Sequence, residues 1–103
     1  MQEIPFSRIG IIKNSKHQNE IGWFITVQDD TQISGGYKIF TSNNHEFENG
    51  YPDPTKTVFD GWVENEELIP VYFKEAEYEV EWTRDQITIE WADDKKSWKW
   101  KRT

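Results

Sequence analysis

The last quarter of the chain decides the fold, because residues 77–101 read EYEVEWTRDQITIEWADDKKSWKWK. Three segments alternate apolar and charged or polar residues: 78–82, 87–91 and 98–100. Such alternation is the period of a strand with one buried face. The polar residues 83–86 and 92–96 separate the segments and are typical of turns. We therefore predict an antiparallel meander of three strands in this region.

The two predicted turns set the register of the meander. The first turn places Val80 opposite Ile89, and the second places Ile89 opposite Trp100. One face is then wholly apolar: Tyr78, Val80, Trp82, Ile87, Ile89, Trp91, Trp98 and Trp100. On the other face, lysines offset a pair of glutamates that would otherwise repel each other. We therefore expect the two tryptophans of the last segment to be core residues rather than a stacking platform for bases.

Three further segments that resemble strands precede the meander: residues 4–12, 20–28 and 37–41. A polar stretch at residues 42–60 follows them and is too long for a tight turn. Residues 62–76 are predicted to be helical, because apolar residues recur there at helical spacing. Asn65 is the candidate N-cap. Pro70 fits only in a first helical turn, so the regular helix is expected to begin nearer Glu67.

These segments predict an α+β fold in a single domain, residues 1–103. We expect an antiparallel β-sheet of five to six strands with one helix packed on one face, in the order βββ-α-βββ. The composition agrees, because isoleucine occurs eleven times, leucine once and alanine twice. Sixteen aromatic residues, six of them tryptophan, supply core area although only 35% of the residues are hydrophobic.

The composition also bears on catalysis. The chain has no cysteine, which excludes disulfides, thiolate zinc sites, iron–sulfur clusters and cysteine nucleophiles. His17 and His45 lie in polar sequence without a partner motif, so we expect exposed loop histidines rather than a base or metal ligands. A glycosidase needs two carboxylates at a defined separation, but with nineteen acids in the chain some pair will always fit, so such a pair does not indicate a glycosidase. We therefore predict a non-enzyme with no catalytic, metal or cofactor site.

Neither a membrane segment nor a leader is visible in the sequence. There is no apolar run of about 18 residues, the length that a membrane-spanning helix needs. The first residues lack the basic start and apolar stretch of a signal peptide. We therefore expect no membrane contact and a cytoplasmic protein that begins at its native Met1.

Charge is distributed unevenly along the chain. There are 12 Lys and Arg against 19 Asp and Glu, for a net charge of −7. Residues 60–81 hold eight acids and one lysine, whereas residues 95–102 hold five bases and no acid. An acidic surface attracts a basic protein and speeds association. It disfavours direct binding of nucleic acid. Acidic strands and helices are also ordinary solvated surfaces, so charge alone selects no partner.

Trp62 stands between the long polar stretch and the predicted helix, among acids. If it is exposed, it is an aromatic anchor with an acidic rim, which is typical of a binding hot spot. If it is buried, it staples the start of the helix. The candidate partner surface consists of this tryptophan and six acids: Asp29, Asp30, Asp60, Trp62, Glu64, Glu66 and Glu67.

A small, acidic, cysteine-free, Trp-rich chain of this kind resembles the immunity proteins of bacterial polymorphic toxins and contact-dependent growth inhibition. Five stretches spread between residues 22 and 82 carry the resemblance: 22–30, 60–64, 67–68, 72–73 and 80–82. The resemblance implies tight binding to a cognate toxin, and many such toxins are basic nucleases. The expected mechanism is steric and electrostatic occlusion of the toxin's active site by a monomer or weak homodimer.

Two alternatives stay open at this point. A phage-encoded or host-encoded protein inhibitor, or a nucleic-acid mimic, would have the same sequence features. A toxin gene next to this gene would distinguish an immunity protein from both. A small carbohydrate-binding module with exposed tryptophan is the other alternative, and tryptophan fluorescence that shifts with oligosaccharide would favour it.

Overall fold

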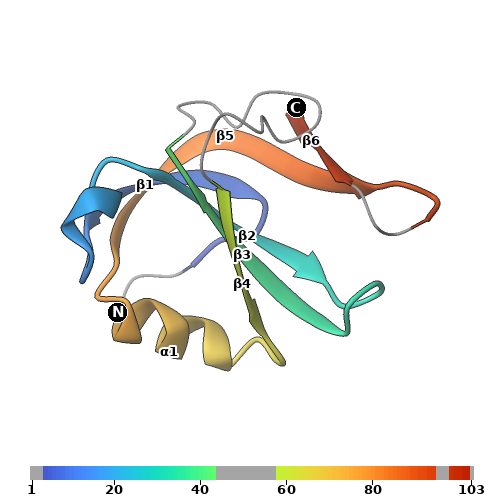
Figure 1. The fold of residues 1–103 in the computed structure, drawn as a ribbon, viewed down its shortest axis with the longest axis horizontal. Coiled ribbons are helices and arrows are strands. Elements are labelled where there is room, and N and C mark those ends of the chain that lie inside the picture. Colours follow the sequence, from blue (N-terminus) through green and yellow to red (C-terminus); the bar gives the residue numbers. More distant parts are fainter. Residues whose placement is uncertain (1–3, 44–57, 95–97, 103) are drawn as a thin grey trace.

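The computed structural model describes residues 4–43, 58–94 and 98–102. Within them the elements follow in this order: β1 (Arg8–Asn14), the 3-10 helix η1 (Gln18–Glu20), β2 (Phe24–Asp30), β3 (Gly36–Ser42), β4 (Val58–Val63), α1 (Leu68–Glu75), β5 (Glu79–Trp91) and β6 (Trp98–Arg102). The strands form one sheet in the order β4-β3-β2-β1-β5-β6, and every neighbouring pair is antiparallel (Figure 1). The predicted α+β class is confirmed. The predicted order βββ-α-βββ is wrong, because four of these strands precede the helix.

The predicted turn at residues 83–86 does not exist, because β5 runs unbroken through it. The first half of β5 pairs with β1, where Val80 lies opposite Ile12 rather than Ile89. The second half pairs with β6, and there Ile89 lies opposite Trp100 as predicted. One long strand therefore replaces the first hairpin of the meander, and the second hairpin pairing is confirmed.

A bulge in β5 explains the polar residues that suggested a turn. Between Trp82 and Gln86, which both pair with β1, three β5 residues stand opposite a single β1 residue, Ile9. Thr83 holds this bulge, since its Oγ1 donates to the carbonyl oxygen of Ile9 at 2.7 Å. The strand therefore continues across a sequence that is locally suited to reversing the chain.

The sheet carries a core on each face, because neighbouring residues of a strand point to opposite sides. One cluster joins α1 to the sheet: Ile12, Ile25, Val27, Ile39, Val63, Ile69, Phe73 and Val80. The other lies on the reverse face: Ile9, Phe40, Ile87 and Trp100. The wholly apolar single face of the predicted meander is therefore wrong. The two halves of β5 serve different cores, since Val80 and Ile87 are seven positions apart and an odd offset places them on opposite faces.

Curling of the sheet closes the second core. The rings of Trp98 and Trp100 lie 4.9 and 5.0 Å from the ring of Phe40, measured between centroids, although β6 and β3 are far apart in the strand order. Trp100 is buried and Trp98 packs against the same cluster. The prediction that these two tryptophans belong to the core is confirmed.

The helix is shorter than the predicted 62–76. It begins at Leu68, with Glu67 rather than Asn65 at the N-cap position and no side-chain cap. Pro70 lies in its first turn, as expected. Trp62 belongs instead to β4, because the β-branched and aromatic residues before it pair in extended form with β3.

The long polar stretch and the two histidines were also predicted from the sequence, but the structure describes only part of them. Residues 44–57 of the predicted polar stretch 42–60, and His45 with them, lie outside the described residues. His17 is exposed just before η1, as predicted. In the described ranges, no helix is both long and apolar enough to cross a membrane.

Candidate functional site

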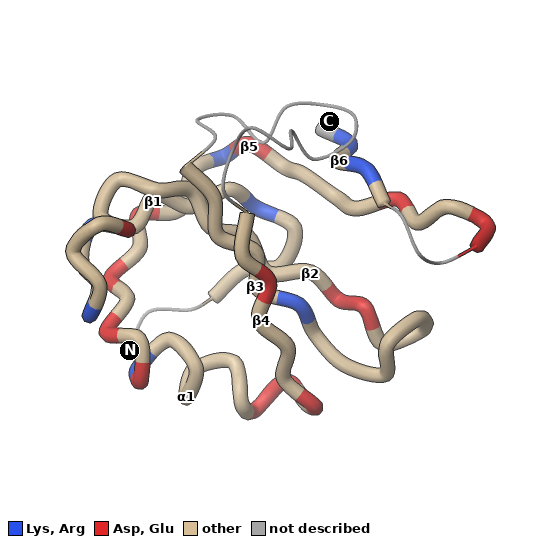
Figure 2. Tube along the Cα trace, viewed as in Figure 1, with Lys and Arg blue, Asp and Glu red and all other residues tan. Residues whose placement is uncertain are grey.

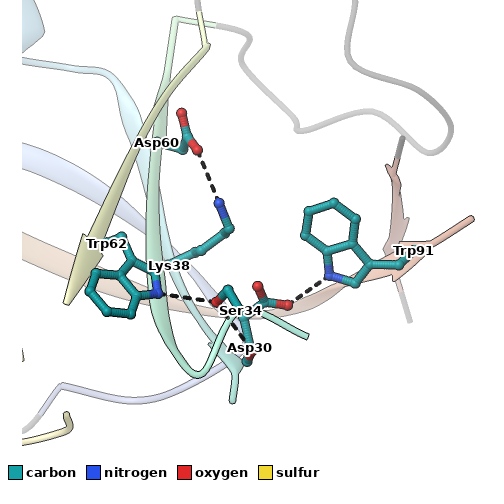
Figure 3. A network of polar contacts seen from close by, with 6 residues as sticks. All are labelled: Asp30, Ser34, Lys38, Asp60, Trp62 and Trp91. Atoms are coloured by element: carbon teal, nitrogen blue, oxygen red, sulfur yellow. Dashed lines mark hydrogen bonds and ion pairs between the residues drawn. The ribbon is translucent and has the colours of Figure 1, made fainter. Parts of the chain in front are cut away.

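Trp62 is exposed, but its orientation is fixed. Its side chain is 48% exposed on β4, the edge strand of the sheet. The indole Nε1 donates to Ser34 Oγ at 3.1 Å, and Ser34 Oγ donates to the carbonyl oxygen of Asp30 at 3.2 Å (Figure 3). The ring also lies against Gly36, where an added Cβ would come within 2.5 Å of it. The buried helix staple is therefore ruled out, and Trp62 presents a held, partly exposed ring.

Asp60 and Lys38 form an ion pair beside this tryptophan. Lys38 Nζ lies 3.2 Å from Asp60 Oδ2, and the two side chains are 18% and 59% exposed respectively. Lys38 stands opposite Trp62 in the β3–β4 register, and Asp60 is two residues from Trp62 along β4. All three side chains therefore lie on one face of the sheet.

Asp30 lies on the same face but is buried, with only 3% of its surface exposed. Its Oδ1 accepts a hydrogen bond from Trp91 Nε1 at 2.7 Å. Its Oδ2 is buried and has no hydrogen-bond partner among the residues that the structure describes. The Lys38 ammonium stands 5.9 Å from the centroid of the Trp91 ring, a cation–π distance. Lys38 thus stands between an exposed carboxylate and a buried one.

We call this group of side chains the Trp62 face: Asp30, Ser34, Lys38, Asp60, Trp62 and Trp91 (Figure 3). It draws on three adjoining regions, namely the β2–β3 hairpin, β4 and the end of β5. Three of its members were predicted site residues: Asp30, Asp60 and Trp62. The structure brings these three to one face of the sheet.

Asp29, the predicted neighbour of Asp30, points to the opposite face of β2. The backbone N–H and the hydroxyl of Thr31 donate to Asp29 Oδ1 at 3.0 and 2.7 Å. These hydrogen bonds hold the pKa of Asp29 below its usual value. Asp29 therefore caps the β2–β3 turn and is not part of the Trp62 face.

Glu64, Glu66 and Glu67 are exposed in the connection from β4 to α1. Figure 2 shows acids gathered there, at the end of β4 that leads into α1. Desolvation, and then the charges of Asp29 and Glu66, raise the pKa of Tyr37, a residue that packs against the helix-covered core. The predicted acids therefore border two faces rather than one surface.

Ser34, Lys38 and Trp91 were not predicted as site residues. Lys38 had a signal, because it is the charged residue within the alternating segment 37–41. Trp91 was assigned to an apolar face, and its contact with Asp30 depends on the curl that brings β5 toward β2. In the described ranges, no group of three or more acids and histidines is placed to hold a metal ion. No family model, curated protein or solved structure matches this chain.

Proposed function

We propose that this chain is a non-catalytic inhibitor of the immunity-protein type, which binds a basic toxin in the cytoplasm. The observation that carries the proposal is Trp62, half exposed yet held by Ser34 and Gly36. Ordering a flexible side chain on binding costs free energy, and a ring that is already held avoids much of that cost. Large aromatic side chains of this kind are frequent binding hot spots.

Charge supports a basic partner. The chain carries a net charge of −7, and the exposed Asp60 carboxylate adjoins Trp62. Glu64, Glu66 and Glu67 follow β4 directly and add negative charge at that end of the strand. Such a surface speeds encounter with a basic protein and suppresses acidic competitors. On a nuclease, these carboxylates would occupy the basic groove that otherwise holds phosphates.

The test is a capture experiment from the native organism at low and high salt, with identification of the captured protein. Trp62→Ala is expected to weaken the affinity for that protein at least about thirty-fold, which corresponds to the roughly 2 kcal/mol of a hot spot. Phe59→Ala is the matched control, because Phe59 is 55% exposed on the same strand but faces the other side. The affinity of the Phe59→Ala variant for the captured protein should stay within a few-fold of the wild-type affinity.

Two results would count against the proposal. If Trp62→Ala binds the partner normally but melts at a lower temperature, Trp62 has a structural role only. If no basic protein is captured and the tryptophan fluorescence shifts with an oligosaccharide, the chain is a carbohydrate-binding module. A basic nuclease encoded next to this gene would support an immunity protein over a phage-encoded or host-encoded inhibitor.

A further inference from the structure

We propose that Lys38 is an exchangeable counter-cation of the Trp62 face: an arginine of the partner replaces it on Asp60, and its ammonium moves to Asp30. This inference rests on the proposed function, since it assumes a basic protein partner. It specifies which side chain of that partner is recognised and what happens to the cation that is already there.

Asp60 and Trp62 together suit an arginine. The Asp60 carboxylate is 59% exposed, so a partner can reach it, and the Trp62 ring stands two residues away on the same face. A planar guanidinium can donate two hydrogen bonds to a carboxylate and also stack on an indole. A lysine ammonium is a point charge without a planar face. The pair should therefore prefer arginine to lysine.

Displacement of Lys38 has a cost unless a second acceptor exists. An arginine on Asp60 would take away the acceptor of the Lys38 ammonium, and a charge on a side chain that is only 18% exposed is unfavourable without a partner. Asp30 offers the acceptor, because its buried Oδ2 has no partner among the described residues. A buried carboxylate oxygen without a donor is itself unfavourable. Transfer of Lys38 to Asp30 would satisfy both groups at once.

The register makes this transfer short. Asp30 pairs with Gly36 on β3, and Lys38 lies two residues further along the same face of that strand. Such diagonal neighbours are within reach of a long side chain. Lys38 Nζ is already 5.9 Å from the Trp91 ring, and the Nε1 of that ring is 2.7 Å from Asp30 Oδ1. In the proposed transfer the Lys38 side chain rotates toward Asp30 and the backbone stays in place.

The first test needs no ligand and follows the Trp91 indole N–H by NMR. Asp60→Asn should release Lys38 to Asp30 and shift this resonance, because the carboxylate that accepts the indole proton gains a cation. The matched control is Glu81→Gln, which breaks an exposed lysine pair elsewhere, Lys13–Glu81 at 3.3 Å, and should leave the resonance in place. In a Lys38→Met background, Asp60→Asn should no longer shift it.

The second test uses an acetylated and amidated tri-arginine peptide as the probe, with the tri-lysine peptide for comparison. The arginine peptide should shift the Trp62 and Trp91 indole resonances with one common midpoint. Asp60→Asn should weaken its binding about ten-fold or more, as loss of a charge-assisted pair predicts, and Glu81→Gln should not. The lysine peptide should bind several-fold more weakly.

Several outcomes would overturn the inference. An unmoved Trp91 resonance in Asp60→Asn, or in a titration that moves Trp62, means that Lys38 does not transfer. If the two peptides bind equally well, or if neither peptide binds, the arginine preference is refuted. In each of these cases capture of a basic protein through Trp62 would leave the proposed function intact. Transfer in Asp60→Asn without any captured basic protein would instead refute the proposed function.

Discussion

Replacement of Gly36 by alanine tests the contact that fixes Trp62. A Cβ at this position would lie 2.5 Å from two atoms of the Trp62 ring and would also press on the backbone carbonyl oxygen of Val63. Neighbouring atoms essentially never approach a Cβ so closely. The indole can swing away, but the Val63 oxygen belongs to the backbone of β4. We therefore expect Gly36→Ala to displace Trp62 and to loosen the pairing at this end of β3 and β4.

The expected cost is set by three contributions. Overpacking of this kind costs about 1–3 kcal/mol. Loss of the hydrogen bond from Trp62 to Ser34 removes about 0.5–1.5 kcal/mol. Alanine recovers about 0.5–1 kcal/mol, because it restricts the unfolded chain more than glycine does. The middle values sum to a net destabilisation of about 2 kcal/mol, within a range of about 0.5–4 kcal/mol, and 2 kcal/mol lowers the Tm by roughly 10 °C for a domain of this size.

The assay is thermal and urea denaturation followed by circular dichroism, with the Trp62 indole resonance as a local probe. Gly35→Asn is the control, because Gly35 has a φ of +82° and nothing within 4 Å of an added Cβ. Asparagine tolerates this left-handed conformation, so the control should lose less than about 1 kcal/mol. A Gly36→Ala protein with wild-type stability and an unmoved Trp62 resonance would refute the packing argument.

Three further predictions concern the cores and the bulge. Trp100→Ala should lose about 3–5 kcal/mol in urea denaturation, because the side chain is only 2% exposed in the second core; a loss below about 1 kcal/mol would contradict the curled sheet. Thr83→Val should cost about 1–2 kcal/mol by the same measurement, whereas Thr83→Ser, which keeps the hydroxyl, should cost less. Burial first, and then the charge of Glu20, raise the pKa of Tyr78 above its usual value of 10.0. The folded state therefore favours the neutral phenol, so the stability it adds is complete below about pH 10 and is lost as the pH rises further. Urea midpoints between pH 8 and 11 should fall more steeply for wild type than for Tyr78→Phe, and equal slopes would exclude this linkage.

The sequence by itself was sufficient for the α+β class and for the C-terminal hairpin pairing. Strict alternation is a local property that does not depend on distant residues. The last two segments are joined by a short connection, so their pairing is local as well. Ile89 therefore stands opposite Trp100 as predicted. The position of Pro70 in the first turn of α1 follows from the same kind of local argument, since a proline is tolerated there without loss of a hydrogen bond.

For the Trp62 face, the sequence identified Asp30, Asp60 and Trp62 as candidates, but it did not show that the three side chains lie on one face of the sheet. Residues 58–63 contain aromatic and β-branched side chains that suit a strand, yet the helical spacing of the apolar residues that follow led to a predicted helix start at residue 62. Pairing with β3 settled the competition in favour of the strand. Exposure of Trp62 followed from that pairing, because β4 became the edge of the sheet.

Composition and periodicity thus determined the class of fold, the acidic character and the aromatic core of this protein. Only the tertiary structure decided whether residues 83–86 reverse the chain or continue it, because a bulge and a turn use the same polar residues and β1 supplied the partner. Only the tertiary structure could bring Trp91 within hydrogen-bond distance of Asp30, which is 61 residues away in the chain. Such a contact depends on the curl of the whole sheet, which no local pattern encodes.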